Sequence, residues 1–181
     1  VAYNALYINY EYNEREKMSK IFNKFDPFDY QNLFYEYELK ITVDEINQTL
    51  ILLKNINTPH QKTTYLHLNI LNFPILKNLK KQIIDILNKK NLLLQDNWAQ
   101  LYNNNNKHII HNHYGSVYSG IIYMNGLEPS PTVFYDSLFN TYNHNFKKNT
   151  LLMFPSMIPH EVKKLKKNEQ RLIISFNTQK K

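Results

Sequence analysis

The second half of this chain consists of short runs rich in Ile, Val, Tyr and Phe, separated by Asn, Gly, Pro and Ser. The runs are DNWAQLY, KHIIHNH, VYSGIIYMN, PTVFYD, NTLLMFP, HEVKKL and RLIISFN, between residues 96 and 177. Residues of the first kind are typical of strands, and residues of the second kind are typical of turns. Several short strands at this spacing predict a β-sandwich or barrel. We therefore expect residues 93–178 to form a jelly-roll core.

The preceding segment, residues 28–92, is predicted to be mainly helical. One strand is expected at 32–41, where NLFYEYELKI alternates apolar and polar residues. TVDE at 42–45 fits a capping box and predicts the start of a helix. Pro74 at a first turn predicts a second helix over 74–90. Both helices carry an apolar stripe, so we expect them to pack against the β core.

The domain organisation follows from length and texture. The 181 residues suit one domain with a substantial core. Residues 1–27 are polar and tyrosine-rich, and we interpret them as an N-terminal appendage or the end of a preceding segment. Residues 28–181 are predicted to form a single domain, in which the helices of 28–92 support the jelly roll.

The composition excludes several kinds of site. The chain has no cysteine, which excludes disulfides, cysteine-ligated metals and a thiol nucleophile. Its three glycines lie at 115, 120 and 126, so it lacks a glycine-rich phosphate-binding loop. No apolar run approaches the roughly 20 residues that a membrane span needs, and no signal peptide is evident. We expect a soluble, cytoplasmic protein.

The formal net charge of +7 is compatible with nucleic-acid binding. However, the lysines are spread along the chain. Lysine, asparagine and isoleucine are all over-used, as A- and T-rich coding would produce regardless of function. Nucleic-acid binding is therefore kept only as the least favoured hypothesis.

The segment HIIHNH, residues 108–113, contains a candidate metal site. On a strand, residues two apart share a face, so His111 and His113 would converge on an ion, whereas His108 would point to the other face. His160 follows a Phe-Pro-Ser bend and is expected at the edge of a strand. The alternative is that these histidines are exposed or engaged in ordinary hydrogen bonds.

Arg171 is one of only two arginines in a chain that otherwise uses lysine. Strand alternation places Arg171, Ile173 and Ser175 on one face. A guanidinium that points into a barrel needs a partner, because a buried unpaired charge costs several kcal/mol. A bidentate carboxylate is the natural partner. That carboxylate belongs either to a ligand or to an Asp or Glu of the protein.

Together, HNHYGSVYSGIIYM, SPTVFYD, LLMFPSMIPHEV and QRLIISFN resemble the iron(II)- and 2-oxoglutarate-dependent dioxygenases. The closest similarity is to the small oxygenases of bacteria and phages that have a prolyl-hydroxylase-like barrel. The resemblance covers roughly residues 94–178 and implies a double-stranded β-helix, a cupin-like jelly roll. In this family the iron(II) is held by two histidines and a carboxylate.

The resemblance also implies roles for individual residues. His111 and His160 match the two iron-binding histidines. Tyr123 and Arg171 match residues that contact the cosubstrate 2-oxoglutarate, and Ser175 shares the face of Arg171. A dry pocket is expected to be lined by side chains such as Tyr123, Phe134 and Phe154.

The chain departs from the family at His113, where the wider family has an aspartate. Three options stay open: a three-histidine site, a carboxylate supplied by Asp136 of the neighbouring PTVFYD strand, or two protein ligands with water or another anion. We favour His113, because it occupies the same face and register as the missing aspartate. Three neutral ligands would leave the iron site one unit more positive.

The function implied by the resemblance is that of an oxidoreductase. An iron(II)- and 2-oxoglutarate-dependent dioxygenase would hydroxylate an unidentified substrate and release succinate and CO2. The expected partners are 2-oxoglutarate and dioxygen, and the first candidate for the substrate is a peptidyl, prolyl residue, with a small molecule as the other option. No catalytic residue beyond the metal site is expected. The alternative is a non-catalytic jelly-roll module that binds a metal or ligand.

Overall fold

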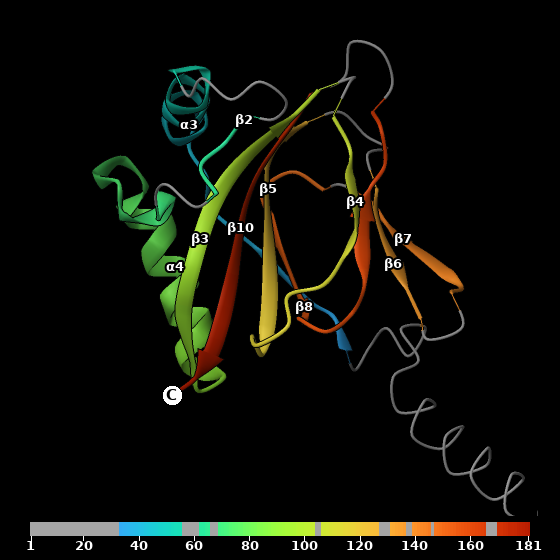
Figure 1. Ribbon diagram of the computed structural model, residues 1–181. Helices are drawn as coiled ribbons and strands as arrows, with labels where there is room; N and C mark the ends of the chain where they lie inside the picture. Colours follow the sequence, from blue (N-terminus) through green and yellow to red (C-terminus); the bar gives the residue numbers. More distant parts are fainter. Residues whose placement is uncertain are drawn as a thin grey trace, which may run out of the picture.

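The computed structural model describes most of the predicted domain. The described residues are 33–55, 62–65, 69–103, 106–126, 131–136, 139–145, 147–165 and 170–181. The predicted appendage at 1–27 lies outside them. The described part contains two antiparallel sheets and two α-helices (Figure 1). This confirms the predicted mainly β fold with N-terminal helices.

The larger sheet has six strands in the order β1-β8-β5-β10-β3-β2. Their bounds are β1 Tyr35–Glu38, β2 Lys62–Thr63, β3 Leu92–Tyr102, β5 Tyr118–Gly126, β8 Thr150–Pro155 and β10 Arg171–Lys180. Each strand pairs with its neighbours in antiparallel fashion.

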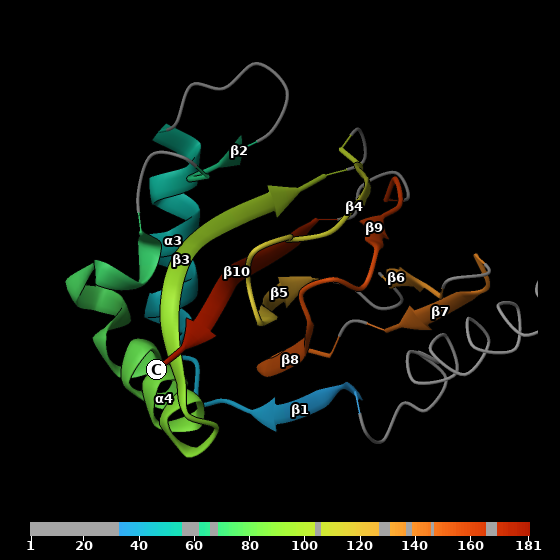
Figure 2. The same cartoon turned by 60° about the horizontal axis from the view of Figure 1, so that its bottom comes forward.

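The smaller sheet has four strands in the order β4-β9-β6-β7. Their bounds are β4 His108–His111, β6 Thr132–Tyr135, β7 Thr141–His144 and β9 His160–Val162. All three pairs are antiparallel. The two sheets lie opposite one another in both views (Figures 1 and 2), so the side chains of their inner faces enclose the interior of a jelly roll.

Most residues of β5, β8 and β10 in the larger sheet are buried on both faces, which explains the nearly continuous apolar sequences of these strands, whereas the edge strand β1 alternates half-buried and exposed residues. In β5, Ile121 and Tyr123 belong to a cluster that also contains Phe134 of the smaller sheet. The residues between and after them, Ile122 and Met124, belong to a second cluster that contains the helices. The first cluster is therefore the barrel interior, and the second is the interface between the sheet and the helices.

Two helices, α3 (Val43–Asn55) and α4 (Lys77–Lys89), cover the outer face of the larger sheet (Figure 2). Two 3-10 turns, η2 (Ile70–Asn72) and η3 (Pro74–Leu76), precede α4. The buried apolar residues of the helices, including Leu53, Ile83 and Leu87, pack in the second cluster. Among the described helices, none has the length and apolar character needed to cross a bilayer.

The predicted capping box at the start of α3 is present. The Glu45 backbone N–H donates to the Thr42 hydroxyl at 3.2 Å. In return, the Glu45 carboxylate accepts from the Thr42 backbone N–H at 2.7 Å. This reciprocal pair satisfies two amide groups that a helix start otherwise leaves unbonded, and it ends the preceding extended segment at residue 42.

Candidate metal centre

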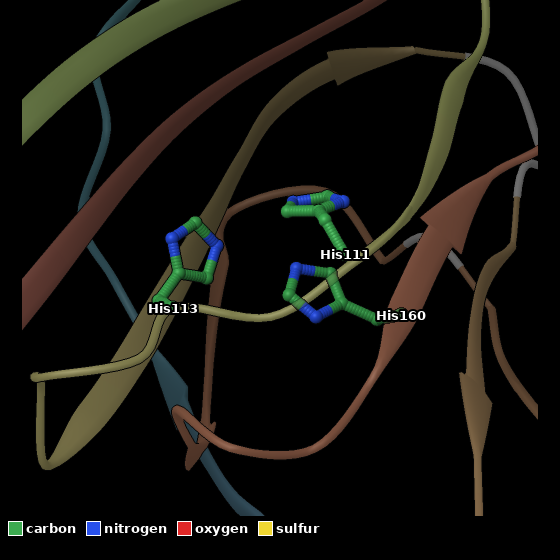
Figure 3. A group of neighbouring side chains, drawn as sticks. All are labelled: His111, His113 and His160. Carbon is green, nitrogen blue, oxygen red and sulfur yellow. The ribbon is translucent and has the colours of Figure 1, made fainter.

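Three histidines from separate positions in the chain converge at one end of the smaller sheet (Figure 3). They are His111 at the end of β4, His113 two residues later, and His160 at the start of β9. One ligand atom from each residue can be chosen so that all three atoms lie within 4.8 Å of one another. The structure thus brings together the three histidines that the sequence singled out.

Strand pairing and a turn hold these histidines in place. His111 and His160 are direct partners in the antiparallel β4-β9 pair, and their ring centroids lie 4.3 Å apart. The backbone N–H of His113 donates to the carbonyl of Ser156 at 2.9 Å, which ties the segment after β4 to the bend before β9. The chain then reverses at Gly115, whose φ of +93° is a conformation that favours glycine.

Backbone hydrogen bonds fix the tautomers of two of the histidines. The Nδ1 atom of His111 lies 2.8 Å from the Ile109 carbonyl, and Nδ1 of His160 lies 3.0 Å from the Ile158 carbonyl. Because a carbonyl only accepts, each Nδ1 carries the proton. The lone pair of each Nε2 is then available to a metal, which is the arrangement usual for metal-binding histidines.

The surroundings keep these rings neutral. Burial lowers the pKa of His160 well below its usual value, and the neighbouring His111 lowers it further. Burial is also the main cause of the lowered pKa of His111. It is likewise the main cause that lowers the pKa of His113, to about 4. A neutral imidazole is the form that coordinates a metal, so at pH 7 no proton has to be displaced.

The donor set fits one transition-metal ion. Neighbouring ligands at a metal–nitrogen distance of about 2.1 Å in an octahedral site lie about 3 Å apart. The histidine nitrogens, within 4.8 Å of one another, reach such spacing by small side-chain rotations. Imidazole ligands suit iron, nickel, copper and zinc.

His108 differs from the sequence prediction, which placed it on the opposite face. Its ring stacks on that of His111 with a centroid distance of 4.0 Å, and it lines the same pocket. The physical reason is an irregularity between His108 and His111 in the pairing of β4 with β9, because a bulge breaks the two-residue alternation of a strand. His108 Nδ1 lies 3.4 Å from the Tyr102 hydroxyl.

Asp136, the alternative third ligand, is engaged elsewhere. Its two carboxylate oxygens accept from the backbone N–H and the side-chain amide of Asn140 at 2.8 and 2.7 Å, in the turn that follows β6. Within the described part of the chain, the residues that lie close enough to share one ion are all histidines. The geometry therefore favours His113 over Asp136.

The histidines open into a pocket between the two sheets. Its other lining residues include Trp98, Gln100, Tyr102, Phe154 and Ser175. A second pocket adjoins the first over His111 and His113, and Trp98 and Tyr65 form one of its walls, with ring centroids 5.0 Å apart. Ser175 lines the pocket into which the histidines open. This is the face that its alternation with Arg171 along the strand predicts.

Arg171 lies one layer behind this pocket and is fully buried. Its guanidinium carbon lies 5.5 Å from the ring centroid of Tyr102, which lines the pocket, and 5.2 Å from that of Tyr123. Its Nη2 donates to the Thr132 hydroxyl at 2.8 Å. Tyr123 and Phe134 likewise lie in the inner cluster, whereas Phe154 reaches the pocket itself.

Sequence reasoning missed a buried polar network beneath the pocket. The Ser119 hydroxyl lies 3.0 Å from that of Ser156 and donates to the Asn177 side chain at 2.9 Å. These residues belong to the SG, FPS and SFN motifs that carried the family resemblance. The signal was therefore present as polar residues within or next to strongly apolar strands, and the network joins β5 and β10 to the bend that precedes His160.

No family model and no curated protein sequence matches this chain. Solved structures match it over most of its length. The viral collagen prolyl hydroxylase vCPH of Paramecium bursaria Chlorella virus-1, in a 2OG complex, has a TM-score of 0.61 at 12% identity, over 81% of this chain and 95% of its own. A prolyl hydroxylase from Trichoplax adhaerens, in complex with a peptide fragment, has a TM-score of 0.61 at 14% identity, over 91% of both chains.

HygX from Streptomyces hygroscopicus, with nickel and 2-oxoglutarate bound, has a TM-score of 0.63 at 9% identity, over 84% of this chain and 85% of its own. At such low identities the similarity shows the fold alone. With its two opposed sheets and supporting helices, the chain has the double-stranded β-helix fold of the 2OG-Fe(II) oxygenases.

Proposed function

We propose that this protein is an iron(II)- and 2-oxoglutarate-dependent dioxygenase. The observation that carries the proposal is the cluster of His111, His113 and His160, whose ligand atoms converge inside a barrel of this fold. A fully buried arginine, Arg171, lies one layer away in the same barrel, and a guanidinium is well suited to bind a carboxylate.

Each part of the site has a role in this proposal. The three histidines hold the iron, Arg171 binds the distal carboxylate of 2-oxoglutarate, and Ser175 contacts the cosubstrate from the pocket wall. When bound, the iron and 2-oxoglutarate supply the oxidising chemistry: one oxygen atom of O2 enters a C–H bond of the substrate, and the other enters succinate as CO2 is released. The protein orients these groups and excludes water with apolar side chains such as Phe154.

The second pocket is the proposed entry for the primary substrate. Its described lining residues are Thr63, Tyr65, Trp98, Gln100, His108, His111, Asn112 and His113. None of these side chains is acidic or carries a permanent charge, which favours an uncharged reacting group. The aromatic wall of Tyr65 and Trp98 suits an aliphatic ring, so a peptidyl proline remains our first candidate.

The metal site can be tested with a natural reporter. Trp98 is the only tryptophan of the chain, and its ring centroid lies 5.7 Å from that of His113. Titration with ferrous iron under anaerobic conditions should quench its fluorescence. Addition of 2-oxoglutarate should then produce a visible charge-transfer band, and admission of oxygen should yield succinate.

Variants separate the ligands from their neighbours. We expect His111→Ala and His160→Ala each to lower iron affinity at least about tenfold, and Arg171→Ala mainly to weaken 2-oxoglutarate binding. His108→Ala is the matched control, because His108 lines the same pocket outside the ligand group. Equal losses in His108→Ala and His160→Ala would refute this ligand set.

The same experiment decides between the enzyme and a non-catalytic module. A three-histidine site without a carboxylate is the feature that favours the module. Quenching by iron without the charge-transfer band or succinate would support metal binding alone and would overturn the dioxygenase proposal. If no metal binds, the dioxygenase proposal and a metal-binding module are both wrong, and a module that binds another ligand is the hypothesis left.

A further inference from the structure

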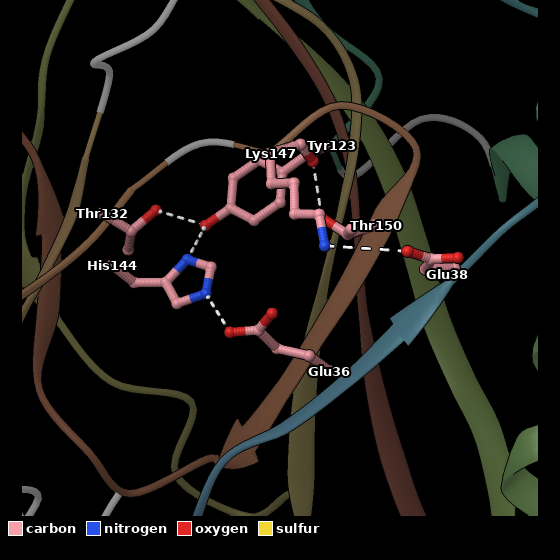
Figure 4. Close-up of polar contacts among 7 residues, drawn as sticks. All are labelled: Glu36, Glu38, Tyr123, Thr132, His144, Lys147 and Thr150. Carbon is pink, nitrogen blue, oxygen red and sulfur yellow. Dashed lines mark hydrogen bonds and ion pairs between the residues drawn. The ribbon is translucent and has the colours of Figure 1, made fainter.

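A chain of hydrogen bonds connects Arg171 with the surface of the barrel. Arg171 Nη2 lies 2.8 Å from the Thr132 hydroxyl, which lies 3.0 Å from the Tyr123 hydroxyl. The Tyr123 hydroxyl lies 3.3 Å from Nδ1 of His144, and Nε2 of His144 lies 2.9 Å from a carboxylate oxygen of Glu36. Figure 4 shows the part from Thr132 to Glu36.

This chain joins the two sheets at their free ends. Glu36 lies on β1, the edge strand of the larger sheet, and His144 lies on β7, the edge strand of the smaller sheet. Thr132, Tyr123 and Arg171 are fully buried, and His144 is 5% exposed. The Glu36 side chain retains 41% of its exposure, so the chain runs from the solvent to the interior.

The donor and the acceptor of each hydrogen bond follow from the two ends of this series, Glu36 and Arg171. The Glu36 carboxylate only accepts, so Nε2 of His144 carries a proton. Burial lowers the pKa of His144, and the neutral ring then presents a bare Nδ1 that accepts from the Tyr123 hydroxyl. At the other end, Arg171 only donates, so the Thr132 oxygen accepts from it.

These assignments fix the direction of the hydrogen bond between Tyr123 and Thr132. Because the Tyr123 proton points to His144, the bond between the two hydroxyls must be donated by Thr132. The Thr132 proton therefore points away from Arg171, and its oxygen lone pair points toward the guanidinium. Without His144, the Tyr123 proton could turn toward Thr132, and Thr132 would then lose the acceptor that fixes the direction of its own proton.

We propose that His144 and Glu36 are positioning residues for the carboxylate-binding arginine: through Tyr123 and Thr132 they hold Arg171 in the orientation that accepts the distal carboxylate of the cosubstrate. This inference rests on the proposed function, because it assumes that Arg171 binds that carboxylate. Neither residue is expected to touch the cosubstrate, the metal or the primary substrate.

The test compares two ligands that differ only at the distal carboxylate. Nickel-loaded protein is titrated calorimetrically with 2-oxoglutarate and with 2-oxobutyrate, which retains the metal-binding 2-oxo acid group but lacks that carboxylate. In His144→Leu and Glu36→Ala we expect 2-oxoglutarate to bind about tenfold more weakly, as loss of one hydrogen bond near a charge implies. The affinity for 2-oxobutyrate and for nickel should be unchanged.

Two further variants separate positioning from a structural role. His144→Gln keeps one acceptor and one donor in the chain and should restore the preference for 2-oxoglutarate. Glu38→Ala is the matched control: Glu38 lies two residues further along β1 and pairs with Lys147 at 3.7 Å in an exposed ion pair (Figure 4). It should bind both ligands as the wild type does.

The outcomes are distinct for the two proposals. If wild-type protein binds nickel but does not prefer 2-oxoglutarate over 2-oxobutyrate, the proposed function fails and this inference fails with it. If the wild type shows the preference and His144→Leu and Glu36→Ala keep it, only the positioning role is wrong. Equal weakening of both ligands would show a general structural role and would also overturn the inference. Glu36→Ala provides the answer should His144→Leu fail to fold.

Discussion

At the scale of a single residue, the side chain at position 113 sets the net charge of the proposed metal centre. With three neutral imidazoles, a bound divalent ion keeps its full double charge, whereas one carboxylate ligand would halve it. A more positive centre attracts a dianionic cosubstrate more strongly. In the proposed function, the identity of this one residue therefore affects the binding of both the metal and the cosubstrate.

Substitutions of His113 test this assignment. We expect His113→Ala to lower ferrous iron affinity at least about tenfold, because one of three ligands is lost. We expect His113→Asp to retain iron and to bind 2-oxoglutarate more weakly than the wild type, because the centre is one unit less positive. Trp98 fluorescence measures the affinity for ferrous iron, and the charge-transfer band measures the affinity for 2-oxoglutarate. If both variants kept full iron affinity, Asp136→Asn would become the decisive variant.

Gly120 is required for a close approach between neighbouring strands. A Cβ atom at this position would lie 2.2 Å from Cζ of the buried Phe176 ring, and the two residues are partners in the β5-β10 register. We expect Gly120→Ala to lower the free energy of unfolding by about 1–3 kcal/mol, measured by urea denaturation.

Its control is a double-mutant cycle. Phe176→Leu removes the atoms that clash, so the double variant should lose less stability than the sum of the two single variants. Gly115→Ala has no atom within 4 Å of its new Cβ and is strained only by its φ of +93°, so Phe176→Leu should not relieve it. Additive losses at Gly120 and Phe176 would contradict the close contact.

At the scale of secondary-structure elements, the burial of a strand's residues determined whether the sequence could predict that strand. The strand RLIISFN was recognisable because Ile173 faces the barrel and its neighbours Leu172 and Ile174 face the helices. In contrast, β7 has the sequence TYNH, and of its residues only His144 is buried. An edge strand of polar residues carries no apolar period, so the sequence did not reveal it.

The same limit applies to the candidate site. His111, His113, His160 and Arg171 could be named from spacing and motif order. The orientation of His108 depends on a bulge in β4, and the bond between His144 and Glu36 joins residues that are 108 positions apart. Neither a local register shift nor a contact across two sheets is visible in a local pattern.

The capping box of α3 provides a test at this scale. Thr42→Ala removes the hydroxyl that accepts from the Glu45 N–H, so we expect a loss of about 1 kcal/mol in the free energy of unfolding. Thr42→Ser retains the hydroxyl and should cost much less. Chemical denaturation followed by circular dichroism measures both, and an equal loss in the two variants would exclude the cap as the cause.

The fold of the whole molecule keeps several histidines neutral. This predicts how the free energy of unfolding depends on pH. The pKa values of five histidines are lowered in the fold, mainly by burial; they are His108, His111, His113, His144 and His160. In the unfolded chain they titrate near 6.5. Below that pH the unfolded state binds more protons than the native state, so stability is present above pH 6.5 and is lost as the pH falls toward 4.

We therefore expect the metal-free protein to lose at least about 1 kcal/mol of unfolding free energy between pH 7.5 and pH 5. Urea denaturation in the presence of EDTA measures this change. In His108→Phe, which removes a group whose pKa is lowered to about 4, the decrease should be smaller. A stability that did not change over this interval would show that the histidines are not held neutral.

The two ends of the candidate site belong to different sheets. His111 and His160 lie on the smaller sheet, and Arg171 lies on β10 of the larger sheet. In the proposed function, the separation of the two sheets therefore sets the length of the acid that can reach both the metal and the guanidinium. Under the same proposal, a 2-oxo diacid too short to span the two sheets leaves one end unbound, so the barrel itself discriminates between cosubstrates by their length.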